Sequence, residues 1–275
     1  MTTQNTTLLD SIDPEIVETL AVRQDEIAKG ASANSKLVAA LALGSIPIAL
    51  GALSKDVYGQ APADVLDVLQ FALLLEYLEG EFYDRGVANA TVMNIPASDR
   101  PVFSTIQAHE NAHIAALRTM ITARGQAPNA KPAFDFTAKG AAAGFNFGAG
   151  QYATFQALAQ AFEDTGVRAY KGQAGRLIND KAALTAALTI HSVEARHAAQ
   201  VRKLRGQKGW ITGNSIGTLP AFTQPIYNGE ENVTQAGLNV SGLGNNNGGV
   251  DAVTEAFDEP LTKVQVTNIV TPFLA

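Results

Sequence analysis

The chain has 275 residues, of which 46% are hydrophobic and 17% charged, and its formal net charge is −6. The low charged fraction fits a surface that neighbouring subunits partly cover, and the acidic balance leaves no basic surface for nucleic acid. The chain contains no cysteine, which excludes zinc–thiolate sites, iron–sulfur clusters, disulfides and cysteine nucleophiles.

Residues 1–60 predict a helical N-terminal extension. Asp13-Pro14 is a helix start signal, and residues 37–53 form a run of seventeen residues without a charge. This run is short for a membrane span and contains Pro47, so we interpret it as a buried helix and expect no membrane partner. The alternative is an export or anchor segment. Two observations disfavour an export signal: about 36 residues precede the run, and no Arg-Arg pair lies before it. We therefore favour a cytoplasmic location and leave periplasmic export open.

Residues 61–207 predict four long helices, at about 63–86, 99–125, 150–171 and 180–205. The second has Pro101 in its first turn, and the fourth starts at the capping residue Asp180. Short links join the first two and the last two helices, which makes each pair antiparallel. Residues 126–149 form one long crossover between the pairs. The predicted fold is therefore all-α, a four-helix bundle with ferritin-like connectivity.

Residues 208–275 predict an irregular C-terminal arm. The segment is rich in Gly, Asn, Thr and Pro, and its only strand signals are short ones near Val233 and Val250. A segment of this kind either lacks order or lies across another subunit. Because an amphipathic helix is predicted from Thr262 to about Thr271, we expect the arm to dock and to hold a homo-oligomer together.

One motif occurs twice in the predicted bundle. Glu110 and His113 form a Glu-x-x-His pair, and the same pattern returns in the fourth helix. Residues three apart share a helix face, so each pair can bind one ion together. Upstream of each pair, a glutamate is followed seven residues later by a tyrosine. The candidate metal ligands are Glu76, Glu110, His113, Glu163, Glu194 and His197, and the two tyrosines are Tyr83 and Tyr170.

Helix register supports a shared site for these residues. The four glutamates each lie about twelve to fourteen residues from the turn of their helix pair, or roughly 18 Å along the axis. Two divalent ions would balance the charge of four glutamates. Oxygen and imidazole ligands without sulfur suit iron or manganese, and zinc could intrude. We expect Glu110 and Glu194 to bridge the ions, with Glu76 and Glu163 as terminal ligands and one histidine on each ion.

Several neighbours of the predicted ligands leave alternatives open. Glu79 could replace Glu76 as a ligand. Gly80 would leave space beside Glu76 for peroxide or dioxygen, and the two tyrosines could hydrogen-bond a ligand or carry an electron. His191 is a candidate partner for a ligand, whereas His109 is interpreted as structural.

A simpler interpretation is that the glutamates pair with arginines on solvated helix faces. The partners would be Arg85, Arg118, Arg168 and Arg196, and Asp164 would be a surface charge. We prefer the two-metal interpretation because the motif and its register occur twice.

The chain also resembles a known family. Residues 69–83, His109-Glu110-Asn111-Ala112-His113 and residues 256–262 resemble the ferritin-like family that includes the desiccation-related proteins. The likeness covers roughly residues 64–205, and it implies a ferritin-like bundle with inferred metal binding. More distantly, the ligand pattern resembles that of manganese catalases, which also use a long C-terminal arm to wrap neighbouring subunits.

The expected function is that of a di-iron or di-manganese carboxylate protein. Its metal pair would react with peroxide or dioxygen, in a catalase-like or ferroxidase-like way. The alternative is a non-catalytic structural protein that protects against stress or desiccation as an assembly.

Overall fold

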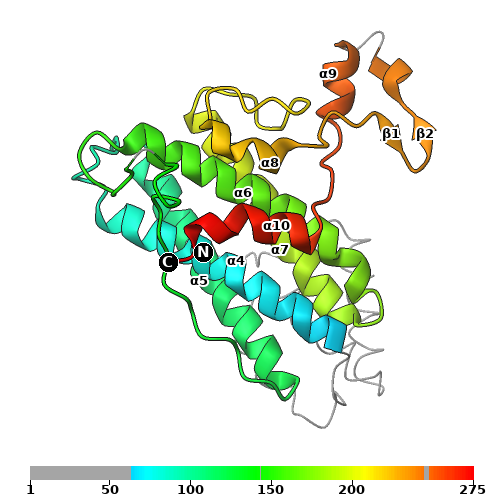
Figure 1. Ribbon diagram of the computed structural model, residues 1–275, viewed down its shortest axis with the longest axis horizontal. Coiled ribbons are helices and arrows are strands. Elements are labelled where there is room, and N and C mark those ends of the chain that lie inside the picture. Colours follow the sequence, from blue (N-terminus) through cyan, green and yellow to red (C-terminus); the bar gives the residue numbers. More distant parts are fainter. Residues whose placement is uncertain (1–62, 143, 245–247) are drawn as a thin grey trace, which may run out of the picture.

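The computed structural model describes residues 63–142, 144–244 and 248–275. The predicted N-terminal extension and its apolar helix at 37–53 lie outside the described residues. The long helices are α4 Ala63–Ala88, α5 Arg100–Ala123, α6 Tyr152–Ala174 and α7 Lys181–Leu204. Helix α4 packs along α5 and α6 along α7, and the two pairs join into one bundle (Figure 1). The prediction of an all-α fold is confirmed, and none of the described helices combines the length and hydropathy needed to cross a bilayer.

The helix ends show which local signals operate. Asp180 caps α7 as predicted, because its side chain accepts a hydrogen bond from the Ala183 amide at 2.9 Å. Asp99 precedes α5 but makes no such cap bond. Its carboxylate instead accepts a hydrogen bond from the Tyr152 hydroxyl at 2.6 Å, which ties the start of α5 to the start of α6.

An aromatic cluster fills the bundle interior on one side of its midpoint. Phe82 is fully buried at its centre, and the Phe155 ring stacks on it with centroids 4.7 Å apart. The crossover between α5 and α6 adds Phe136, Phe145 and Phe147 around Phe82. Aromatic pairs of this kind contribute about 0.5–1.5 kcal/mol each beyond the area they bury. The crossover is therefore packed onto the core and fixes the two helix pairs against each other.

The remaining elements are short and belong mainly to the C-terminal arm. They are η2 Gly175–Leu177, η3 Ala221–Thr223, α8 Gln224–Tyr227, β1 Thr234–Gln235, β2 Leu238–Asn239, η4 Ser241–Gly244, α9 Gly249–Thr254, α10 Lys263–Val270 and η5 Thr271–Phe273. The strands β1 and β2 form a two-stranded antiparallel hairpin. The strand signal near Val233 thus precedes a short strand, whereas Val250 lies in a helix and its strand signal was wrong.

The C-terminal arm packs on the bundle of its own chain. Helix α10 crosses the outer faces of α6 and α4 (Figure 1), and Thr262 and Gln265 form a capping box at its start. Gly172 on α6 lets the arm backbone approach closely, since a Cβ there would lie 1.9 Å from the Leu261 carbonyl oxygen. We expected the arm to dock, and these contacts join it to the bundle of its own chain. The role of the arm in a homo-oligomer stays a prediction.

A buried arginine on α6 binds the C-terminal arm. The Arg168 side chain donates to the backbone carbonyls of Glu259 at 2.7 Å, Asn228 at 3.0 Å and Ile226, and it pairs with the Glu230 carboxylate at 2.7 Å. These partners all belong to the arm. Arg168 is therefore committed to the arm and not to the predicted metal ligands.

Candidate metal centre

The six residues with ligand-type side chains meet in the middle of the bundle. Each of the four long helices contributes a glutamate, and α5 and α7 add the histidines one turn later. All six side chains are buried. The helical spacing of three in Glu-x-x-His places the two members of each pair on the same inward face.

The ligand-type atoms form two overlapping groups. Glu76, His113, Glu110 and Glu194 offer one group of atoms that lie within 4.8 Å of one another. Glu163 and His197 form the second group together with the same Glu110 and Glu194. The two glutamates from Glu-x-x-His therefore belong to both groups, which is the geometry that bridging ligands require. This buried cluster could hold metal ions.

Distances around His113 resemble those between ligands of one ion. Its Nδ1 lies 3.2 Å from Glu76 Oε2, 3.1 Å from Glu110 Oε2 and 3.1 Å from Glu194 Oε1. One proton cannot serve three acceptors at once. Ligand atoms bound to one transition-metal ion at about 2.1 Å lie about 3 Å from each other, so the spacing of these four atoms would suit a cation.

His197 has the matching arrangement and one further contact. Its Nδ1 lies 2.8 Å from Glu110 Oε1 and 3.3 Å from Glu163 Oε2. Its Nε2 lies 2.9 Å from Nδ1 of His109, and the two rings stack. If His197 Nε2 donates to His109, Nδ1 of His197 is left with a free lone pair for a cation.

The role of His109 was missed from the sequence. We interpreted it as structural because it lies about 100° around the helix from Glu110, and we considered His191 as the partner of a ligand. Nδ1 of His191 has no hydrogen-bond partner among the described residues. His109 does point away from the cluster, but the His197 ring extends between α5 and α7 to reach it, and helix phase alone does not reveal this.

The two tyrosines cross between the helix pairs. The Tyr83 hydroxyl on α4 donates to Glu163 Oε1 on α6 at 2.5 Å, and the Tyr170 hydroxyl on α6 donates to Glu76 on α4. Burial and the adjacent carboxylates raise the pKa of both hydroxyls well above the usual range, so both stay protonated and donate. The crossed bonds give the site an approximate twofold symmetry.

Electrostatics show that the metal-free cluster binds protons. Burial raises the pKa of Glu76 to about 8 and that of Glu163 well above its usual range. Burial alone would lower the pKa of His197, but Glu163 and a hydrogen bond to Glu110 outweigh it and raise the pKa to about 12. Burial acts to raise the pKa of Glu194, yet hydrogen bonds from both histidines lower it to about 2. The metal-free cluster therefore has to hold protons where cations fit.

Unpartnered atoms point to the same conclusion. Five buried ligand-type atoms of the six residues lie within ion-pair distance of another residue of the cluster but make no well-formed hydrogen bond to a described residue: Glu110 Oε1, Glu163 Oε2, both carboxylate oxygens of Glu194, and His197 Nδ1. Buried polar atoms are normally satisfied, and a group left unpaired calls for a bound ion or water. The donor set and these atoms fit divalent transition-metal ions.

The predicted pairing of the glutamates with arginines is not found for three of the four arginines. Arg85 pairs with Glu81, Arg118 donates to the Tyr77 hydroxyl, and Arg168 binds the arm. These arginines lie on outer helix faces. The buried glutamates of the cluster are thus left to one another and to the histidines.

Two predictions about the surroundings of Glu76 can now be compared with the structure. Glu76 has an oxygen in the first ligand group, whereas Glu79 is buried beside the cluster and belongs to neither group. Gly80 does not leave open space, because a Cβ there would lie 2.7 Å from Ile114 Cδ1. The absence of a side chain at Gly80 instead allows α5 to pack closely on α4.

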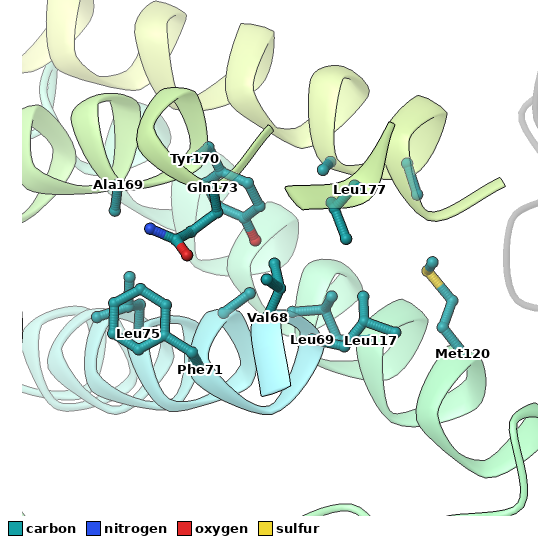
Figure 2. A pocket seen from close by; sticks show the side chains of 13 residues that line it. Val68, Leu69, Phe71, Leu75, Leu117, Met120, Ala169, Tyr170, Gln173 and Leu177 are labelled. Carbon is teal, nitrogen blue, oxygen red and sulfur yellow. The ribbon is translucent and has the colours of Figure 1, made fainter. Parts of the chain in front are cut away.

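An apolar cavity lies beside Tyr170, whose hydroxyl donates to Glu76. Figure 2 shows its lining, in which Tyr170 and Gln173 are the polar residues. The space open to the centre of a water-sized molecule is about 20 Å³, enough for one small molecule. The lining residues are Val68, Leu69, Phe71, Ala72, Leu75, Leu117, Met120, Ala169, Tyr170, Gln173, Leu177, Ala186 and Ala187.

A four-helix bundle with one long crossover and a buried carboxylate–histidine cluster defines the ferritin-like class. The ferritin-like domain family matches residues 64–207, and the chain belongs to this family. A search of curated proteins found no match.

Proposed function

We propose that this protein is a di-metal carboxylate protein, with iron or manganese, that is redox-active toward peroxide or dioxygen. The observation that carries the proposal is the pair of overlapping ligand groups that share Glu110 and Glu194. When bound, the metal pair would supply Lewis-acid and redox chemistry. Donor atoms without sulfur favour iron or manganese, with zinc as a competitor.

The residues around the cluster have defined tasks in this proposal. Tyr83 and Tyr170 hold the terminal ligands Glu163 and Glu76 in place through their hydroxyls. The same tyrosines are close enough to the ligands to carry an electron. His109 orients His197 through the ring nitrogens.

The size of the cavity beside Tyr170 supports the proposal that the oxidant is a small molecule. It is too small for a ring or a chain, and its mostly apolar lining disfavours charged molecules. Catalase-like and ferroxidase-like activities both use oxidants of this size. The resemblance to manganese catalases favours the former and the wider ferritin-like family the latter.

Elemental analysis of protein purified without chelator tests the proposal. We expect about two transition-metal ions per chain in the wild type and their joint loss in Glu110→Ala, because Glu110 belongs to both groups. The control is Glu81→Ala, which removes the same charge from a pair with Arg85 and Lys131 outside the cluster. Peroxide-consumption and ferrous-oxidation assays then separate the two activities. The proposal is contradicted if the wild-type protein contains no transition-metal ion and has the same melting temperature as Glu110→Ala.

The alternative is a stress- or desiccation-protective assembly protein, and the C-terminal arm is the reason to keep it. The segment with β1, β2 and α9 projects from the bundle (Figure 1), and it exposes Leu238, Leu243 and Val250. Exposed apolar residues gathered on a projection favour contact with a second copy of the chain. Light scattering measures the molar mass in solution and should show a homo-oligomer for the wild type. The double variant Leu238→Asp with Leu243→Asp should be a monomer. A monomeric wild type contradicts this alternative.

A further inference from the structure

Glu79 is a fifth buried carboxylate at the cluster, and it lacks a counterion. It lies one turn after Glu76 on α4, its side chain is 3% exposed, and its Oε2 has no hydrogen-bond partner among the described residues. Burying an unpaired carboxylate is among the most costly arrangements in a protein interior. Glu79 therefore requires an explanation that packing alone does not give.

The twofold symmetry of the site is broken at this position. Glu79 follows Glu76 by three residues, and the matching position after Glu163 is Gly166. A Cβ on Gly166 would lie 3.2 Å from Glu79 Oε1, tighter than ordinary contact. Gly166 thus leaves room for the Glu79 carboxylate, which extends from α4 toward α6.

The position of Gly166 also shows which half of the cluster Glu79 approaches. Glu194 Oε1 lies 3.1 Å from His113, whereas Glu194 Oε2 faces His197. The same Cβ on Gly166 would lie 3.5 Å from Glu194 Oε2. Glu79 and Glu194 Oε2 therefore border one volume, on the side of the group that contains Glu163 and His197.

Electrostatics agree with this placement. Burial raises the pKa of Glu79 well above its usual range, and Glu194 followed by Glu163 contribute most among the neighbouring carboxylates. Glu76 contributes least of the four, although it is on the same helix. A cation in the second group would offset the repulsion between Glu79 and these carboxylates.

We propose that Glu79 is a further ligand of the ion that Glu163 and His197 hold, so that the two ions bind with unequal affinity. This inference rests on the proposed function, because it needs two ions at the cluster. The ion held by Glu76 and His113 has no such extra carboxylate, since Gly166 occupies the matching position.

Cobalt(II) is a suitable probe, because calorimetry gives its stepwise affinities and visible absorption reports its ligand set. We expect two unequal binding steps in the wild type. Glu79→Gln keeps the shape of the side chain and removes its charge, and it should weaken only the tighter step, by at least about tenfold. The control Glu81→Gln should change neither step.

A pair of variants related by the twofold symmetry tests the same inference without changing Glu79. Glu76→Gln removes a carboxylate from the ion that has no extra ligand, whereas Glu163→Gln leaves Glu79 on the other ion. We therefore expect Glu76→Gln to weaken its ion more than Glu163→Gln does. Circular dichroism of each metal-free variant checks that the fold is retained.

The outcomes separate the two proposals. Wild-type protein that binds no cobalt contradicts the proposed function and this inference together. The role of Glu79 alone is contradicted by a different outcome. In it the wild type binds two cobalt ions with equal affinity, Glu79→Gln leaves both affinities unchanged, and Glu76→Gln and Glu163→Gln weaken binding equally. In that case Glu79 is a neutral acid that fills space beside Gly166.

Discussion

Glu163 and Asp164 are neighbours on α6, and both are buried, yet their surroundings are opposite. Asp164 accepts hydrogen bonds from the Arg202 guanidinium at 3.1 and 2.5 Å and from the Tyr227 hydroxyl at 2.6 Å. Glu163 accepts a hydrogen bond from the Tyr83 hydroxyl at 2.5 Å, whereas its Oε2 lies 3.3 Å from His197 Nδ1 and makes no hydrogen bond among the described residues. A buried charge with a structural role is neutralised by the chain itself. A buried acid that shares its surroundings with other acids and with histidines could instead be neutralised by a bound ion.

The comparison also corrects one interpretation of the sequence. We expected Asp164 to be a surface charge, because it points away from the face that carries Glu163. It does point away, but the C-terminal arm covers that face and buries Asp164 with Tyr227. Helix α6 is therefore buried on both sides, with a metal-type cluster on one and an ion-pair cluster on the other.

The sharpest test of this difference is substitution of each acid. Asp164→Ala should lower the free energy of unfolding by about 3–5 kcal/mol, because Arg202 is left buried and uncompensated. Glu163→Gln in metal-free protein should leave it nearly unchanged, because burial raises the pKa of Glu163 well above its usual range and a neutral amide then replaces a neutral acid. Urea denaturation of both variants measures the effects, and equal destabilisation would remove the distinction between the two clusters.

Metal removal should affect stability through the inner cluster only. An ion present at a hundredfold excess over its dissociation constant stabilises the folded state by about 2.7 kcal/mol per site. Chelation should therefore lower the melting temperature of the wild type. Thermal scans with and without chelator should show the same shift in Tyr227→Phe, which changes the ion-pair cluster, and no shift in Glu110→Ala.

Metal affinity should increase with pH. Protons on Glu76, with its pKa of about 8, and on His197, with its pKa of about 12, compete with cations in the metal-free cluster. Each proton released makes the affinity rise about tenfold per pH unit. The slope should decrease above pH 8, where Glu76 has already lost its proton. Cobalt titrations between about pH 6 and 9 measure this, and a pH-independent affinity contradicts it.

The smallest effects should come from the crossed tyrosines. Loss of one hydroxyl removes a hydrogen bond worth roughly 1 kcal/mol and loosens one terminal ligand. Tyr83→Phe should weaken the ion beside Glu163, and Tyr170→Phe the ion beside Glu76, each by about tenfold. The matched control is Tyr152→Phe, whose hydroxyl contacts Asp99 outside the cluster. Equal weakening of both ions by either variant would contradict the crossed arrangement.

The four long helices and the convergence of six side chains follow from the order of amino acids alone. Helical periodicity is local, so a spacing of three assigns Glu110 and His113 to one face without knowledge of any other helix. The repeat of the motif and its distance from each turn then bring the four glutamates to one height. Charge balance among these residues predicts divalent cations as the partner.

The contacts around the cluster and the burial of Asp164 were decided by the packing of segments that are distant in the sequence. The crossing of Tyr83 to Glu163, the contact of His197 with His109, and the filling of the space beside Gly80 by Ile114 depend on how far apart the helices pack. The burial of Asp164 depends on an arm without periodic signal that docks through Arg168. Such distances result from the packing of many side chains at once, and no local spacing in the chain encodes them.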